Sequence, residues 1–257
     1  MLFNRSFFIL GCGAWLCGLG TAWAQTTDAA AQRLLAAYPG QLCSASANVL
    51  HWCNGASSLL ADPSAQPDLK AQLAQPYPAG PLQAPPSTDP GRARNQAFFK
   101  QMYGATPAEV ARQLVRVPWM PKSAPGQSLQ VTRVNRVDER VRAISAELDA
   151  LPAALKAQVL RPSGGFAWRK VAGEAQLSAH SWGIAIDINT AVSDYWRWRD
   201  GPPRPGRPDA PRWRNRIAPE VVAVFERHGF IWGGKWQHYD TMHFEYRPEL
   251  LAPQAQP

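Results

Sequence analysis

The order of the predicted segments favours an α+β fold with a largely antiparallel sheet. Segments with apolar residues at helical spacing mix with short strand-like runs, without the regular βαβ alternation of a parallel sheet. The 257 residues, of which 46% are hydrophobic, suffice for one substantial core, so we expect a single compact domain. The composition excludes a disordered chain, a collagen-like chain with only 19 glycines and a disulfide miniprotein with only 4 cysteines.

Residues 1–24 have the pattern of a signal peptide. Arg5 is the only charge, an apolar run covers 7–19, and Thr-Ala-Trp-Ala at 21–24 supplies a small-x-small cleavage site. We therefore expect an exported protein, periplasmic or secreted, without a stable membrane span after cleavage. The uncharged stretch 6–24 is about long enough to cross a bilayer, so a retained membrane anchor is the alternative.

Two cysteines remain in the exported chain. Cys12 and Cys17 lie in the signal, and a lipoprotein attached through Cys12 is disfavoured because the apolar run continues past it. Cys43 and Cys53 lie ten positions apart in a compartment where disulfides form, which predicts a bridge between them. A zinc site made by this pair with His51 is the alternative, although it lacks a fourth ligand and the usual short spacing.

Residues 25–115 are predicted to form a helical and proline-rich extension packed on the core. A helix over 26–38 begins with Thr and Asp, has apolar residues at helical spacing and stops at a Pro-Gly pair. Eight prolines over 63–92 exclude long regular elements, so this stretch is expected to wrap over the core. A second helix, over 106–114, starts with Thr106 as N-cap and a proline at its first position.

Residues 116–257 are predicted to form the core itself. Its strands are indicated by alternating or short apolar runs, and its helices by apolar residues at i, i+3 and i+4 or by a proline start and glycine stop. The predicted elements are, in order, strand 129–134, helix 137–151, strand 184–188, helix 218–228 and strand 242–246.

The positions of the histidines suggest a metal site. His180 stands in a loop, a turn at Gly183 follows, and a short strand then brings Asp187 close to His180 at the sheet edge. An antiparallel last strand places His243 opposite Asp187. Two imidazoles and a carboxylate are three ligands for Zn²⁺, and they leave the fourth position for the water of a hydrolytic site. On spacing alone, scattered core histidines remain the alternative.

Candidates for proton transfer lie around His243. Asp240 precedes it by three residues, so a tight turn directs its carboxylate to the water side of the metal as general base and later general acid. Glu245 is the competing base, because positions i and i+2 of a strand share a face. His238 is expected to donate a hydrogen bond to the intermediate or to hold a carboxylate, unless it is a surface imidazole. His228, at the end of a helix, is interpreted as structural.

Arg169 lies eleven residues before His180 and is a candidate clamp for a substrate carboxylate or a developing oxyanion. An arginine that only solvates a face is the alternative, since the chain is rich in arginine.

Two ordered motifs resemble those of a known peptidase family. Ser178-Ala-His180-Ser-Trp-Gly-Ile-Ala-Ile-Asp187 is similar to the Ser-x-His-x₆-Asp signature of zinc D-alanyl-D-alanine carboxypeptidases of the VanX/VanY type and related L-alanyl-D-glutamate endopeptidases. The segment ending in Asp240-Thr-Met-His243-Phe-Glu-Tyr246 resembles the endopeptidase-like branch, in which Asp replaces Glu before the second histidine. The resemblance is strongest over 164–250, with weaker similarity such as Phe98-Phe-Lys-Gln-Met-Tyr-Gly104 further back.

This resemblance implies roles for individual residues. It implies Zn²⁺ as cofactor, a compact α+β fold around a central antiparallel sheet, and zinc-activated water attacking a peptide bond of peptidoglycan stem peptides. Which bond is cut, terminal D-Ala-D-Ala or L-Ala-D-Glu, stays open. The implied residues are His180, Asp187 and His243 as zinc ligands, Asp240 as acid/base, Arg169 polarising the carbonyl with Arg161 as the fallback, and Ser178 as a substrate contact.

The basic excess of the chain is concentrated in one loop. The formal charge is +8, and cleavage of the signal removes one Arg. Loop 197–216 holds seven arginines against Asp200 and Asp209. We expect this loop to overhang the metal and to gather anionic cell-wall polymer by salt-sensitive attraction. A solvated insertion without a partner is the alternative.

Peptidoglycan peptides are therefore the expected partners of a protein that we expect to be a monomer. A non-catalytic wall-binding protein that keeps the fold and the metal would show a degraded ligand set, and the motifs are intact. The pI of 9.6 and the 11 tryptophans are also compatible with a nucleic-acid binder. The export signal argues against that alternative, and we expect no nucleic-acid partner.

Overall fold

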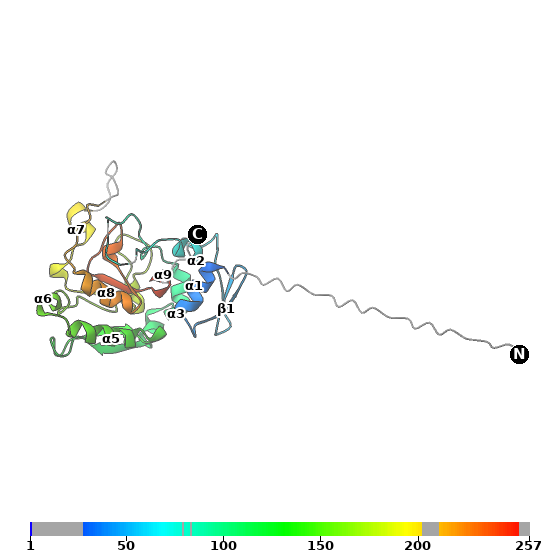
Figure 1. Cartoon of the computed structure of the whole chain (residues 1–257), viewed down its shortest axis with the longest axis horizontal. Helices are drawn as coiled ribbons and strands as arrows, with labels where there is room; N and C mark the ends of the chain where they lie inside the picture. Colours follow the sequence, from blue (N-terminus) through cyan, green and yellow to red (C-terminus); the bar gives the residue numbers. More distant parts are fainter. Residues whose placement is uncertain (2–27, 79, 83, 202–210, 252–257) are drawn as a thin grey trace.

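Figure 1 shows an α+β molecule built from short helices and short strands. The computed structural model describes residue 1 and residues 28–78, 80–82, 84–201 and 211–251. The predicted signal peptide, residues 1–24, falls outside this range apart from its first residue, as does the middle of loop 197–216. Within the described ranges, no helix is both long and apolar enough to cross a membrane.

The helices are interspersed along the whole described chain. They are α1 (Ala29–Ala37), α2 (Leu69–Leu73), α3 (Gln96–Tyr103), α4 (Pro107–Ala111), α5 (Val137–Asp149), α6 (Ala153–Lys156), α7 (Trp196–Asp200), α8 (Pro219–Arg227) and α9 (Pro248–Leu251). Four 3₁₀ turns accompany them: η1 (Val134–Arg136), η2 (Ala179–Trp182), η3 (Thr190–Val192) and η4 (Gly233–Lys235).

The strands form three small antiparallel sheets, where the sequence predicts one central sheet. The first contains β1 (Leu42–Ser46), β2 (Val49–Trp52) and β3 (Ser57–Leu59), the second β4 (Leu114–Pro118) and β5 (Ser128–Thr132), and the third β6 (Ala185–Asp187), β8 (His243–Tyr246) and β7 (Phe230–Trp232) in that order.

An irregular segment lies between the second and third sheets. The backbone N–H of Phe166 donates to Gln130 in β5, and Gly164 forms a single antiparallel bridge with Asp187 in β6. Because this connecting segment contributes isolated bonds rather than a continuous ladder, the predicted sheet is divided in two.

Most of the elements predicted from apolar spacing are present, within a few residues of their expected ends. Asp28 caps α1, since its carboxylate accepts a hydrogen bond from the N–H of Ala30. The helix predicted over 106–114 is shorter than expected and ends at Ala111. Leu114 already belongs to β4, where it pairs with Thr132 of β5.

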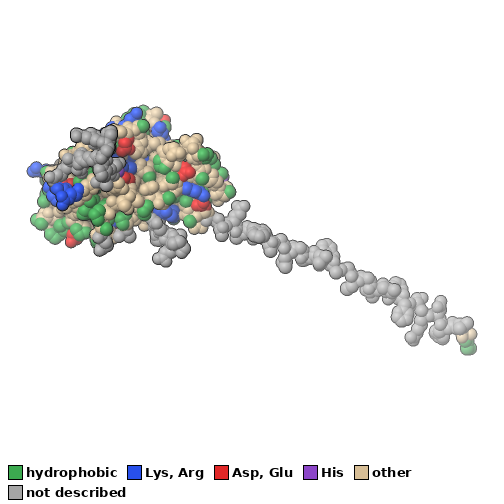
Figure 2. Space-filling model, turned by 90° about the horizontal axis from the view of Figure 1, so that it is seen from above, with side chains coloured by type: hydrophobic (Ala, Val, Ile, Leu, Met, Phe, Trp, Pro, Cys, Tyr) green, Lys and Arg blue, Asp and Glu red, His purple; other side chains and the backbone are tan. Residues whose placement is uncertain are grey.

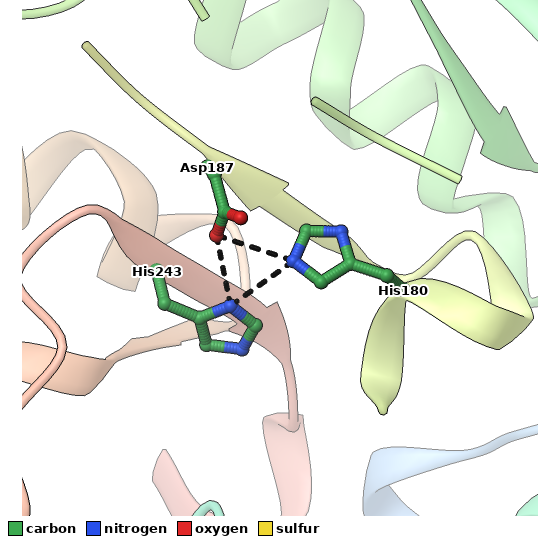
Figure 3. Close-up of side chains that lie close together, drawn as sticks. All are labelled: His180, Asp187 and His243. Atoms are coloured by element: carbon green, nitrogen blue, oxygen red, sulfur yellow. Dashed lines mark hydrogen bonds and ion pairs between the residues drawn. The ribbon is translucent and has the colours of Figure 1, made fainter. Parts of the chain in front are cut away.

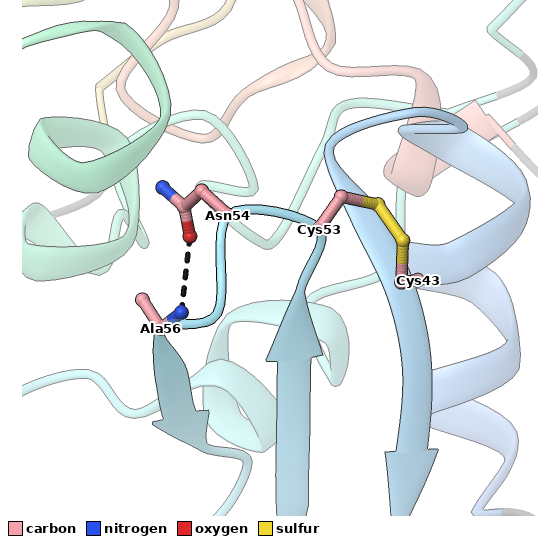
Figure 4. Close-up of a disulfide and its surroundings, with 4 residues drawn as sticks. All are labelled: Cys43, Cys53, Asn54 and Ala56. Atoms are coloured by element: carbon pink, nitrogen blue, oxygen red, sulfur yellow. Dashed lines mark hydrogen bonds between the residues drawn. A yellow bond between two sulfur atoms is a disulfide. The ribbon is translucent and has the colours of Figure 1, made fainter.

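The first sheet is a meander that the sequence analysis did not predict. Cys43 in β1 and Cys53 just after β2 form a disulfide that links these two neighbouring strands (Figure 4). This pairing confirms the predicted bridge and removes the alternative zinc site at the cysteines. His51 instead has its Nε2 2.8 Å from the hydroxyl of Ser46.

The N-terminal region packs against the C-terminal end of the core. In Figure 1, α1 (blue) lies beside α9 (red). The hydroxyl of Tyr38, at the end of α1, donates to the carboxylate of Glu249 in α9, and Arg33 donates to the carbonyl oxygen of Glu249. The division at 115/116 remains a prediction, and β4 runs across it.

The third sheet rests on α8. The helix begins with Pro219 in its first turn and buries Val221, Val224 and Phe225. The ring of Phe225 stacks on Phe244 of β8 with centroids 3.8 Å apart. This contact anchors the strand that carries His243.

Candidate metal centre

The turn that carries His180 is fixed by local chemistry. The hydroxyl of Ser178 accepts a hydrogen bond from the N–H of His180 at the start of η2. Gly183 ends the turn in the left-handed region, with φ +66°. A Cβ at that position would lie 2.9 Å from the backbone nitrogen of Thr132, so only glycine fits, as the predicted turn requires.

The pairing of β6 with β8 brings the second and third candidate ligands together. Asp187 and His243 are direct partners in the antiparallel register, the arrangement that the sequence predicts. His180, Asp187 and His243 point toward one another from η2, β6 and β8 (Figure 3).

Three donor atoms converge at this point. Nε2 of His180 lies 3.2 Å from Oδ1 of Asp187, Nδ1 of His243 lies 3.0 Å from the same oxygen, and the two nitrogens are 3.3 Å apart. Ligands of a tetrahedral Zn²⁺ at its usual bond lengths are separated by about 3.3 Å. The donor set and its spacing therefore fit a zinc ion with a fourth position left for another ligand.

Hydrogen bonds on the far side of each ring select the tautomer that metal binding needs. Nδ1 of His180 lies 2.5 Å from the carbonyl oxygen of Gly165, and Nε2 of His243 lies 3.1 Å from Oε2 of Glu245. When each of these nitrogens donates its proton, the other ring nitrogen presents a lone pair to the centre.

A pocket of about 230 Å³ is lined by two of the three candidate ligands, Asp187 and His243. Its polar lining comes from both halves of the chain, and its apolar lining includes Tyr195, Trp236 and Met242. The ionisable and hydroxyl-bearing residues that line it are Arg92, Arg94, Arg169, Ser178, Asp187, Tyr195, Asp240 and His243.

Asp240 lies in this pocket, as predicted from its position before β8. Its backbone N–H donates to Gly233, and its carbonyl oxygen accepts from the N–H of His243, which fixes the turn. Its Oδ1 is buried and has no hydrogen-bond partner among the described residues. Burial, together with the nearby charge of Asp187, raises the pKa of Asp240 to about 6.

Two of the three candidate ligands, Asp187 and His243, have strongly shifted pKa values. Burial opposes ionisation of Asp187, but the neighbouring His180 and His243 outweigh it and hold its pKa well below the usual range. Burial also disfavours a charge on His243, but its hydrogen bonds to Asp187 and Glu245 raise its pKa to about 9. At neutral pH the metal-free centre therefore pairs an ionised Asp187 with a protonated His243, and a bound cation would displace the proton of His243.

Glu245, the competing base, lies behind His243 rather than in the pocket. Its side chain is fully buried and accepts hydrogen bonds from Arg94 at 2.8 Å and Arg247 at 3.0 Å. Burial raises its pKa, but Arg94, His243 and Arg247 together lower it to well below its usual range. This geometry favours a role in orienting His243 over proton transfer to substrate.

Arg169 lines the pocket, whereas its fallback Arg161 lines a separate cavity beside Gly164. The backbone at Arg169 is tied to the His180 turn, since its N–H donates to the hydroxyl of Ser181 and its carbonyl oxygen accepts from the N–H of Ser178. Its guanidinium is exposed and therefore accessible to a ligand.

His238 does not face this pocket. Its Nδ1 lies 2.7 Å from the carboxylate of Asp89, and its ring packs edge-on against Trp196. His228 pairs with Glu147 at the end of α8, away from the pocket lining.

The described part of loop 197–216 is tied to the body of the protein. Arg197 donates to the carbonyl of Ala172, and Arg216 pairs with Asp194 at 3.0 Å. The Lys and Arg side chains on the face seen in Figure 2 form separate groups rather than one continuous band.

Sequence reasoning missed the residues that reach the centre from the N-terminal region. Arg94 lines the pocket and Arg92 stands beside it over Trp236, but arginines are common in this chain and no spacing to a ligand distinguishes them. The close fit of Gly91 against the ring of Trp236, where a Cβ would lie 2.0 Å away, could not be predicted from the sequence either.

Comparison with known proteins agrees with the geometry. Residues 172–246 match the model of a family described as D-alanyl-D-alanine carboxypeptidase, which confirms the resemblance of the two motifs. The match contains His180, Asp187, Asp240 and His243. It begins at residue 172 and therefore does not include Arg94 or Arg169. A search of curated proteins finds no significant match to the chain.

Proposed function

Because all four candidate residues of the centre lie in a segment that matches a carboxypeptidase family, we propose that this protein is an exported zinc peptidase acting on peptidoglycan stem peptides. The observation that carries the proposal is the convergence of three donor atoms at 3.0–3.3 Å beside a pocket. His180, Asp187 and His243 would hold the ion.

A Zn²⁺ ion held by these three residues would lower the pKa of a water molecule and polarise the carbonyl of the peptide bond. Asp240 takes up the proton of the attacking water with its unpartnered Oδ1, and then delivers a proton to the nitrogen of the departing amine. One carboxylate thus serves both transfers, and the proton count balances.

Arg169 has an exposed guanidinium on a backbone fixed beside the His180 turn. It donates to the carbonyl oxygen as negative charge develops there, or to a carboxylate of the substrate. Ser178 lies at the same wall and contributes a substrate contact. His238, held by Asp89, supports the loop around Trp196 at the edge of the site.

Export and the wall partner belong to the same proposal. The Cys43–Cys53 disulfide supports an oxidising compartment, periplasmic or secreted. The predicted cleavage after Ala24 would release the rest of the chain, which we propose is a monomer. Loop 197–216 is proposed to attract anionic cell-wall polymer, with its midsection outside the described residues.

The test is digestion of defined muropeptides by the purified chain from Gln25 onward, loaded with zinc, followed by mass analysis. Loss of one terminal alanine identifies the D-Ala-D-Ala carboxypeptidase. Separation of L-Ala from the rest of the stem identifies the L-Ala-D-Glu endopeptidase. Bound zinc with neither product would overturn the peptidase and favour the wall-binding protein.

A further inference from the structure

The structure assigns a positioning role to Arg94, whose guanidinium joins the two segments that carry the ligand histidines. This inference rests on the proposed function, because it concerns the same zinc centre. Arg94 belongs to the N-terminal part of the chain, outside the segment that matches the carboxypeptidase family.

The first arm of this link reaches His243. Nη2 of Arg94 donates to Oε2 of Glu245 at 2.8 Å, and the same oxygen lies 3.1 Å from Nε2 of His243. Arg94 therefore keeps Glu245 in place as a hydrogen-bond acceptor. That acceptor holds the His243 proton on Nε2 and leaves Nδ1 directed at Asp187 and the metal position.

The second arm reaches the His180 turn. Nη1 of Arg94 donates to the carbonyl oxygen of Leu177 at 3.1 Å. Leu177 directly precedes Ser178, which caps the turn and accepts from the N–H of His180. The N–H of Leu177 is bound in turn by the side chain of Gln96, two residues after Arg94. The segment that contains Arg94 and Gln96 thus binds both the carbonyl oxygen and the N–H of Leu177, at the start of the His180 turn.

Arg94 is itself firmly placed. Only 3% of the residue is exposed, and Nη2 also donates to the carbonyl oxygen of Gly91 at 2.8 Å. The backbone of Gly91 is pressed against the ring of Trp236, so the segment has little room to shift. A planar guanidinium can donate in these three directions at once, whereas the ammonium of lysine is a single point on a flexible stem.

The experiment compares Arg94→Gln and Arg94→Lys with the wild type. Zinc affinity is measured by competition with a chromophoric chelator at fixed pH, and thermal unfolding of the zinc-free protein reports whether each variant folds. We expect Arg94→Gln to weaken zinc binding about 10- to 100-fold, the range found when an outer partner of a metal ligand is lost. Arg94→Lys should recover part of that loss, since it keeps the charge beside Glu245 but not all three contacts.

Arg33→Gln is the matched control. Arg33 is a partly buried arginine that donates to the carbonyl oxygens of Leu73 and Glu249, and it contacts neither ligand-bearing segment. It should lower the melting temperature while leaving zinc affinity within about threefold of the wild type.

The outcomes separate this inference from the proposed function. A wild type that binds no zinc removes the proposed function itself. Folded Arg94 variants that bind zinc as tightly as the wild type overturn only the role of Arg94. Failure of both variants to fold, with or without zinc, makes Arg94 a requirement of the fold and likewise overturns the positioning role.

Discussion

Two groups of buried charges meet at His243 and differ in how they are balanced. The ligand cluster, defined as His180, Asp187, Asp240 and His243, contains two carboxylates and no Lys or Arg in an ion pair with either of them among the described residues. The charge network, defined as Arg94, Glu245, Arg247 and Glu249, contains two carboxylates and two guanidiniums in close contact.

The difference indicates what each group is for. A buried charge is costly unless it is paired, and the charge network pairs every carboxylate inside the protein. The ligand cluster leaves its negative charge for something that binds. Where a fold keeps a buried carboxylate oxygen such as Oδ1 of Asp240 without a hydrogen-bond partner among the described residues, its cost to stability suggests a role in binding or catalysis.

The largest effect is expected from removing a ligand. His243→Ala should lose zinc and reduce hydrolysis to background, because two donor atoms no longer define the site. Zinc content and muropeptide hydrolysis are measured on the same preparation. His228→Ala is the matched histidine control, since His228 contacts Glu147 and should keep both properties. A zinc-free His243→Ala protein with full activity would contradict the proposed mechanism.

Asp240→Asn should separate catalysis from metal binding. The expected change is a fall in kcat of about 10²- to 10⁴-fold, the usual contribution of a positioned acid/base, with one zinc retained. The folded pKa of about 6 lies above the ordinary value of 3.8, so the ionised carboxylate destabilises the metal-free fold at pH 7. The variant should therefore unfold at a higher urea concentration than the metal-free wild type.

The contrary result for this prediction is equally specific. If Asp240→Asn turns over normally while Glu245→Gln keeps its zinc and loses turnover, the proton is transferred by Glu245 and the charge network is catalytic.

The convergence of His180, Asp187 and His243 could be predicted from the sequence, because a zinc site would restrict both residue type and spacing. His180, Gly183 and Asp187 form one short local motif, and the pairing of its strand with His243 follows from the antiparallel pattern. Asp240 could be placed because three residues and a turn leave its carboxylate few positions.

The charge network could not be predicted in this way. Arg94 and Glu245 are 151 positions apart, and arginine carries no local signal for its partner. The meander β1–β3 was missed because its strands contain small polar residues and alternate weakly. The predicted antiparallel pairing was confirmed. The prediction of one central sheet was wrong, because the lengths of the strands and the irregular segment at Gly164 are set by packing and not by the apolar pattern.

Removing Arg247 from the charge network should destabilise the fold. Arg247→Met leaves Glu245 and Glu249 buried without that partner, and the expected loss is about 3–5 kcal/mol of unfolding free energy. Urea unfolding of the metal-free protein measures it. Arg142→Met is the control, because its half-exposed pair with Asp138 is worth less than about 1 kcal/mol. Equal losses in the two variants would mean that the network contributes no special stability.

The smallest effect is the pH dependence of zinc binding, and it tests the place where the two groups meet. Because Asp187 and Glu245 raise the pKa of His243 to about 9, the ring of His243 is protonated at neutral pH in the metal-free protein. Zinc needs the unprotonated Nδ1, so binding releases that proton and affinity falls about tenfold for each pH unit below 9. Asp187 stays ionised over this interval, since its pKa is held well below the usual range, and it releases no proton.

Chelator competition at pH 6, 7 and 8 and constant ionic strength measures this slope, and calorimetry in two buffers counts the protons released. Glu245→Gln removes one of the two groups that raise the pKa of His243, so the interval over which affinity depends on pH should shift downward. A wild-type affinity that is flat from pH 6 to 8 would mean that His243 is already neutral. The charge network would then orient the ring without changing its proton affinity.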